Sequence, residues 1–102
     1  MSWIKDSSEL TEILKNEWLN PQSGLAEPIV IEEESPQTQT LRLYVVWSKW
    51  AALSQQQRSE IVMDAFSLVA TKENRPQDVA RVTIAMGLTR EDAERMQIQL
   101  PA

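Results

Sequence analysis

A chain of 102 residues has room for one domain, spanning residues 1–102, because domains usually hold on the order of 100 to 150 residues. Its 42% hydrophobic and 25% charged residues are typical of a globular protein, and it contains neither cysteine nor histidine. These absences exclude disulfides, thiolate nucleophiles, metals bound by cysteine or histidine, and the Ser-His-Asp and Cys-His catalytic arrangements. We therefore expect no enzyme active site, no metal and no cofactor.

The net charge of −5 is concentrated in the first part of the chain. Residues 1–40 hold two basic and eight acidic side chains, whereas residues 41–102 hold eight basic and seven acidic ones. This distribution disfavours nucleic acid, whose phosphates usually meet a basic surface. The N-terminus lacks a signal-peptide pattern and no apolar run approaches the roughly 18 residues of a membrane span, so we expect a cytoplasmic protein without membrane association.

The first predicted element is an amphipathic helix from Asp6 to Leu19, followed by the helix-breaking pair Asn20-Pro21. Its apolar side chains recur at spacings of three and four: Leu10, Ile13, Leu14 and Trp18. Asp6 is the expected N-cap, with Glu9 three residues later.

Two β-strands are predicted next, over residues 29–33 and 41–47, with a polar connection between them. In the second strand Leu41, Leu43, Val45 and Trp47 alternate with mostly polar residues, which gives the strand one apolar face. The pair therefore predicts a β-hairpin. The acidic run Glu32-Glu33-Glu34 is read as a solvated strand end, with a cation or a basic partner as the alternative.

The next helix is predicted from Gln55 to about Thr71, with Ser54 as N-cap and Gln57 as its capping-box partner. Its core-facing side chains have helical spacing: Ile61, Val62, Ala65, Phe66 and Val69. Trp47 and Trp50 precede this helix and are expected to pack where the strand meets it.

Residues 72–78 are polar and predict a loop, with a short helical turn starting at Pro76. Residues 79–86 fit either a helix or a strand, and the β-branched run Val82-Thr83-Ile84 favours the strand. Gly87 is expected to end it. Thr89 then caps a last helix with Asp92 at its third position, and Ala93 and Met96 are expected to face inward.

These elements predict an α+β fold in the order α-β-β-α-(α)-β-α, with a small three-stranded sheet covered on one face by helices. An unpaired edge of such a sheet can template association, so a homodimer is a further expectation.

The segment LRLYVVWSKWAALS from Leu41 to Ser54, followed by Arg58 and the helix containing Ile61–Phe66, resembles the BolA-like family. The resemblance implies an αββααβ core related to type II K-homology domains. In that family the second strand runs into an aromatic-containing turn before a helix that bears arginine and histidine. Trp50 would stand for the aromatic, Arg58 for the arginine, and Ala80–Thr89 for the third strand and its exit.

Two departures from these families limit what the resemblance implies about function. The chain has no histidine to match the one that BolA-like proteins use with monothiol glutaredoxins, so iron–sulfur chemistry is not expected. Gly24 and Gly87 are isolated and form no Gly-x-x-Gly clamp, so K-homology RNA binding is not expected either.

The preferred hypothesis is therefore a non-enzymatic adaptor or regulatory domain that binds a protein through the sheet edge or the corner around Trp50. Tyr44 and Trp50 are candidate contacts because aromatics dominate binding hot spots, with core packing as the alternative. Lys49, Arg58, Arg75 and Arg81 could converge as a basic patch, or each could be a solvated charge. Such a patch would support the alternative function, a nucleic-acid-binding domain of the same fold.

Overall fold

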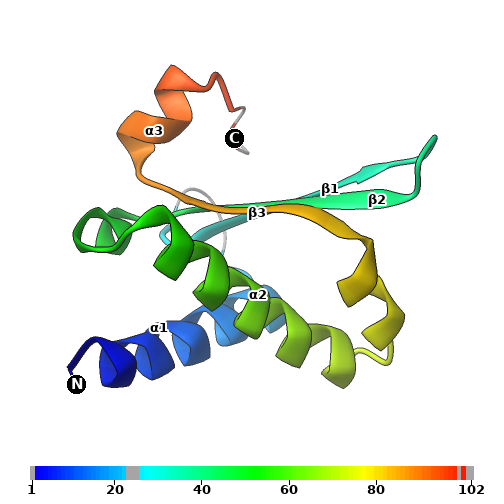
Figure 1. The fold of residues 1–102 in the computed structure, drawn as a ribbon, viewed down its shortest axis with the longest axis horizontal. Coiled ribbons are helices and arrows are strands. Elements are labelled where there is room, and N and C mark those ends of the chain that lie inside the picture. The colour runs from blue at the N-terminus through cyan, green and yellow to red at the C-terminus, as the bar shows by residue number, and fades with distance from the viewer. Residues whose placement is uncertain (1, 23–25, 99, 101–102) are drawn as a thin grey trace.

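A computed structural model describes residues 2–22, 26–98 and 100, with side chains from Ser8 onward. Its helices and strands follow the order predicted from the sequence (Figure 1). The α-helices are α1 (Ser2–Leu19), α2 (Gln55–Lys72) and α3 (Arg90–Arg95), the strands are β1 (Ile29–Ser35), β2 (Thr40–Val46) and β3 (Val82–Leu88), and the 3-10 helices are η1 (Ser48–Ala52) and η2 (Pro76–Arg81).

The three strands form one mixed sheet in the order β1-β2-β3. β1 and β2 form the predicted hairpin and are antiparallel, whereas β2 and β3 are parallel. A parallel neighbour requires a crossover connection, and the segment from η1 through η2 supplies it. The predicted α+β class with a three-stranded sheet is confirmed.

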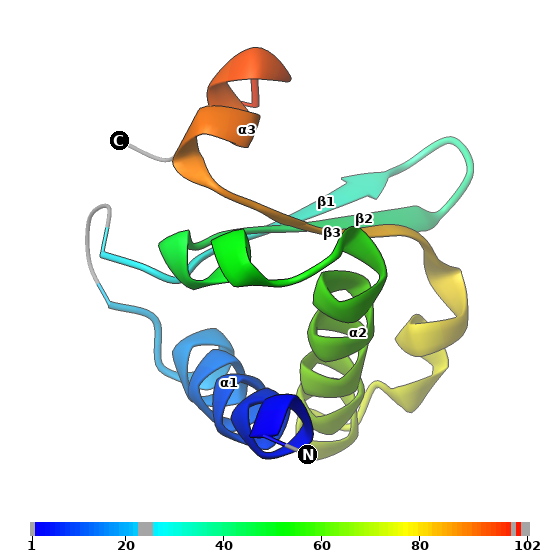
Figure 2. The same ribbon diagram turned by 60° about the vertical axis from the view of Figure 1, so that its left-hand side comes forward.

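The main core lies between the sheet and the two long helices, which Figure 2 shows on the same side of the sheet. The alternating residues Leu41, Leu43, Val45 and Trp47 all join this core, as their spacing predicts. The rings of Trp18 and Phe66 lie 5.3 Å apart and join α1 to α2. The side chain of Trp3 lies outside the described residues.

The short helix α3 packs on the opposite face of the sheet (Figure 1). Its buried Ala93 belongs to a second apolar cluster together with Val46, Leu88 and Ile29. The second cluster arises because Tyr44 and Val46 alternate with the main-core residues of β2 and therefore point to the other face. The long helices thus cover one face as predicted, and α3 covers one end of the other.

Both capping predictions are confirmed. The Ser54 hydroxyl accepts a hydrogen bond from the Gln57 backbone N–H, and the Gln57 side chain accepts one from the Ser54 backbone N–H. Thr89 and Asp92 make the equivalent reciprocal pair at the start of α3. The short turn from Pro76 and the strand that begins at Val82 are confirmed as well.

Three local predictions are wrong. Helix α1 begins at Ser2, so Asp6 lies inside the helix and is not its cap. Gly87 lies within β3, where close packing against Trp50 and Arg58 requires a residue without a Cβ atom. Met96 follows the end of α3 and is 44% exposed, because the helix ends at Arg95 before its last turn can bring that side chain inward.

Candidate functional site

Trp50, a predicted partner contact, is fully buried in the main core. Its indole Nε1 donates a hydrogen bond of 2.9 Å to the backbone oxygen of Val45, and its ring meets that of Trp47 edge-on at 5.2 Å. A buried indole N–H needs an acceptor, and the strand carbonyl supplies one. The corner between β2 and α2 is therefore packed core and offers no aromatic surface to a partner.

The four predicted basic residues are divided between the two ends of α2. Arg58 lies in its first turn, whereas Arg75 and Arg81 follow its C-terminus and share the carboxylate of Asp78. A helix of 18 residues is about 27 Å long, so the two ends form separate surfaces. Lys49 is exposed on η1.

Arg58 is buried and links three segments. Its Nε donates to the backbone oxygen of Leu53 at 3.0 Å, and its Nη1 donates to that of Gly87 at 3.2 Å. The same Nη1 lies 3.3 Å from Oδ2 of Asp92. These partners satisfy a buried guanidinium inside the protein, so Arg58 joins α2, β3 and α3.

Each glutamate of the acidic run in β1 pairs with a different arginine. Glu32 pairs with Arg75 at 2.8 Å, Glu33 approaches Arg42 at 3.8 Å, and Glu34 pairs with Arg81. Adjacent strand residues point to opposite faces, so the three carboxylates do not converge. Among the described residues, no group of three or more acidic side chains could hold a metal ion.

All six arginines of the chain have a carboxylate partner inside the fold. The three arginines that do not pair with β1 form Arg58–Asp92, Arg95–Asp92 and Arg90–Glu27, the last at 2.8 Å. An arginine that binds a phosphate uses the same guanidinium face that here meets a carboxylate. Phosphate contacts would therefore compete with the pairs that hold the fold together.

Two carboxyl groups with lowered pKa values serve as anchors of the fold. The backbone N–H of Ser48, followed by the Ser48 hydroxyl and Arg90, lowers the pKa of Glu27. The backbone N–H of Thr89, followed by Arg95, lowers the pKa of Asp92. Both groups are therefore ionised well below neutral pH, which suits a structural anion and not a general acid or base.

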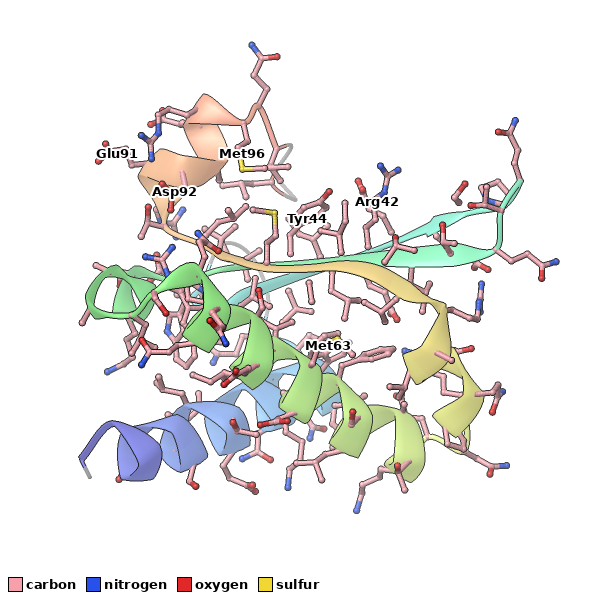
Figure 3. The ribbon with its side chains drawn as sticks, viewed as in Figure 1. Arg42, Tyr44, Met63, Glu91, Asp92 and Met96 are labelled. Atoms are coloured by element: carbon pink, nitrogen blue, oxygen red, sulfur yellow. The ribbon has the colours of Figure 1, made fainter. Side chains whose placement is uncertain are left out.

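Tyr44, the remaining predicted contact, lies on the α3 side of the sheet. Figure 3 shows Tyr44 and Arg42 rising from the sheet on the same side as Met96, whereas Met63 lies below it, next to α2. Tyr44 is opposite Ile31 in β1 and opposite Met86 in β3, so the three make one apolar row across the sheet. Ala93 of α3 belongs to one buried cluster with Tyr44 and with the neighbouring row, Ile29, Val46 and Leu88.

We call this surface the open sheet face, defined by Ile31, Tyr44, Ile84, Met86 and Met96. Tyr44 is buried, with 8% of its surface exposed, Ile31, Ile84 and Met86 are half-buried, and Met96 is exposed. The pair Arg42–Glu33 flanks it toward the hairpin tip. Apolar surface rimmed by charges is typical of a protein-binding site.

Sequence reasoning found only Tyr44 among these residues. A signal for the others was present, because Val82, Ile84, Met86 and Leu88 alternate and the even positions of β2 include Tyr44 and Val46. Two strands with apolar residues at both alternating positions indicate a sheet covered on both faces. Helix α3, with Ile98 and Leu100 after it, covers only part of the second face.

No protein-family model, curated protein or solved structure matches the chain. Within the described residues, the helices are too short or too polar to cross a membrane. What the chain binds must therefore be argued from its own surface.

Proposed function

We propose that this protein is a non-enzymatic, cytoplasmic adaptor or regulatory domain that binds a protein partner on the open sheet face. The observation that carries the proposal is the apolar row of Ile31, Tyr44 and Met86, which the short helix α3 and the following residues Ile98 and Leu100 cover only in part. A sheet face that is apolar yet only half covered gains free energy when a partner removes it from water.

The side chains of this face suit a protein partner. Met86 and Met96 have flexible, polarisable side chains that adapt to the shape of another apolar surface. Tyr44 is an aromatic residue of the kind enriched at binding hot spots, and 8% of its surface is exposed. The paired charges of Arg42 and Glu33 would form part of a polar rim.

The alternative function, nucleic-acid binding, has weaker support. The chain is acidic overall, and its six arginines are paired with carboxylates. A nucleic-acid surface needs several cations that are free to meet phosphates. The adaptor function needs none.

The element order also supports a fold-level relationship to BolA-like proteins. Helix, two strands, helix and third strand follow one another, with η2 at the place of the family's second central helix. Only the fold is proposed to be shared, because the chain lacks histidine and so lacks the family's cluster-binding residue.

The experiment is an affinity capture of the tagged protein from its own cells, with and without nuclease, read by quantitative mass spectrometry. Met96→Glu places a charge on the open sheet face, where Met96 is 44% exposed. Leu68→Glu is the matched control, because Leu68 is 47% exposed on the outer side of α2.

We expect a nuclease-resistant protein at near-equal amount, recovered with the wild type and with Leu68→Glu and reduced about tenfold with Met96→Glu, as for loss of a contact worth about 1.4 kcal/mol. Equal recovery with both variants would contradict the proposed surface. Loss of all partners after nuclease treatment would favour nucleic-acid binding instead.

A further inference from the structure

The outer edge of β3 is closed by side chains of α2. The Ser59 hydroxyl donates to the backbone oxygen of Ala85 at 2.7 Å, and Gln55 and Arg58 both donate to that of Gly87 at 3.2 Å. The Leu88 oxygen accepts from the Trp47 N–H and so points toward β2. Carbonyls alternate in direction along a strand, so those of Ala85 and Gly87 lie on the outer edge. This edge cannot accept another strand.

The outer edge of β1 is open. Because the Trp47 N–H points toward β3, alternation directs the backbone groups of Val46 and Tyr44 toward β1. Their opposite residues Ile29 and Ile31 therefore face β2, and the N–H and C=O groups of Val30 and Glu32 face outward. No hydrogen bond within the described residues occupies these outward groups. β1 is thus the edge at which a strand can add.

We propose that this edge pairs with β1 of a second copy of the chain, antiparallel about a two-fold axis at Ile31, to give a continuous six-stranded sheet. In this register Val30 of each copy lies opposite Glu32 of the other, so two hydrogen-bonded pairs form. The inference does not rest on a partner at the open sheet face, because the edge contact is made by backbone groups of Val30 and Glu32, although Ile31 borders both surfaces.

Hydrogen bonding and charge select this register among the neighbouring ones. Outward-facing residues must lie opposite outward-facing residues, so the axis must pass through a residue, and the nearest alternatives are Val30 and Glu32. An axis at Glu32 places two like charges directly opposite, which is destabilising. An axis at Val30 places Glu32 opposite Pro28, which has no N–H to donate. Only an axis at Ile31 avoids both defects.

The acidic residues of the two β1 strands do not lie opposite each other in this arrangement. The strand is apolar from Ile29 to Ile31 and acidic from Glu32 to Glu34, so antiparallel pairing sets the acidic half of each copy against the apolar half of the other. The three glutamates are already neutralised by arginines of their own chain. Like-charge repulsion therefore does not oppose the contact.

The side chains at the axis continue the apolar row of the open sheet face. Ile31 is half-buried because its outer side has no neighbouring strand. In the dimer it would lie beside Ile31 of the second copy, and the row of Met86, Tyr44 and Ile31 would run through the axis into its counterpart. Ile31 would then become buried on both sides, which is favourable for an apolar side chain.

The first test is the mass of the unmodified full-length protein by sedimentation equilibrium from about 10 µM to about 1 mM, because small interfaces are weak. We expect a mass that rises toward twice 11.7 kDa. A monomer over the whole range would overturn the proposal and leave the edge to a strand of another protein.

The register is tested by single cysteines, which the chain otherwise lacks. Ile31→Cys sets two thiols opposite each other in a non-hydrogen-bonded pair, whose Cα atoms lie about 4.5 Å apart, within the range for a disulfide. Glu33→Cys is the matched control on the same strand face, with the two thiols displaced by roughly 13 Å along the strand. We expect cross-linking at least about tenfold faster for Ile31→Cys. Equal rates would overturn the register.

A second pair of variants isolates the backbone contact. Glu32→Pro removes the outward N–H used twice in the dimer, whereas Glu32→Ala loses the same carboxylate and keeps the N–H. We expect Glu32→Ala to dimerise and Glu32→Pro to remain monomeric, with the circular dichroism of both unchanged. Dimerisation of folded Glu32→Pro to the same extent would overturn the edge pairing.

Discussion

The Nη1 atom of Arg58 lies 3.3 Å from Oδ2 of Asp92, so the first turn of α2 on one side of the sheet holds α3 on the other. Arg58 reaches Asp92 past the end of β3, where it also binds the Gly87 oxygen. A buried guanidinium therefore helps to fix the position of α3, together with the Arg90–Glu27 pair and the packing of Ala93.

Replacing Arg58 by methionine should lower the free energy of unfolding by about 2 kcal/mol, because buried hydrogen bonds to a charged group are worth about 1.5–3 kcal/mol. Amide exchange in α3 should accelerate as well. Arg95→Met is the control, since Arg95 pairs with the same Asp92 but is mostly exposed, and its loss should cost less than about 0.5 kcal/mol. Urea unfolding measures both, and equal losses would contradict the anchoring role of Arg58.

Gly87→Ala should destabilise the fold by about 1–3 kcal/mol through overpacking. An added Cβ atom would lie 2.7 Å from Cβ of Arg58 and 2.8 Å from Cε2 of Trp50. The Trp50→Phe change should cost less in the Gly87→Ala background than in the wild type, because the smaller ring relieves the clash. Additive losses in this double-mutant cycle would show that the two residues do not compete for space.

Arg75 should matter more for stability than Arg42, although both pair with a glutamate of β1. Arg75 lies over the Phe66 ring at 5.5 Å and also binds Asp78 and Glu73, whereas the Arg42 contact is a single exposed pair. Arg75→Ala should cost about 1–2 kcal/mol and Arg42→Ala less than about 0.5 kcal/mol. Thermal and urea unfolding test this order, and a reversed order would be incompatible with it.

Acid should destabilise the protein through Asp92 and Glu27. Their pKa values are lowered from the usual 3.8 and 4.5, so the folded state binds these protons less readily than the unfolded state. Their contribution is complete above the usual values and is lost as the pH falls through the lowered ones. We expect a nearly constant free energy of unfolding from pH 7 to about 5 and a decline below.

The variant Asp92→Asn with Glu27→Gln should show a shallower decline between about pH 5 and 3 than the wild type, because two of the titrating groups are gone. Urea unfolding at several pH values provides the comparison. An identical slope would mean that neither carboxyl group contributes to the acid sensitivity.

Much of the fold follows from local sequence rules. Ser54 with Gln57 and Thr89 with Asp92 are capping boxes, and their residues satisfy each other's backbone groups over three positions. The alternation in β2 predicted the main core because a strand has a period of two. Such signals involve only neighbouring residues, so they survive without knowledge of the tertiary structure.

The errors concern residues whose environment comes from distant parts of the chain. Gly87 was read as a strand end, but its role is set by Trp50 and Arg58, which are far from it in sequence. The same holds for the basic residues, because the carboxylates that pair with Arg75 and Arg81 lie on β1 and η2. The separation of Arg58 from Arg75 and Arg81 by the length of α2 could be known only once the helix was placed.

The central claim is that a protein partner binds the open sheet face, and methionine methyl NMR tests it most directly. The chain has four methionines, of which Met86 and Met96 lie on this face and Met63 packs on the helix side of the sheet. On titration with the captured partner, we predict that the methyl signals of Met86 and Met96 shift while that of Met63 does not. A shift of Met63 with Met86 and Met96 unchanged would contradict the account and place the partner on the helices.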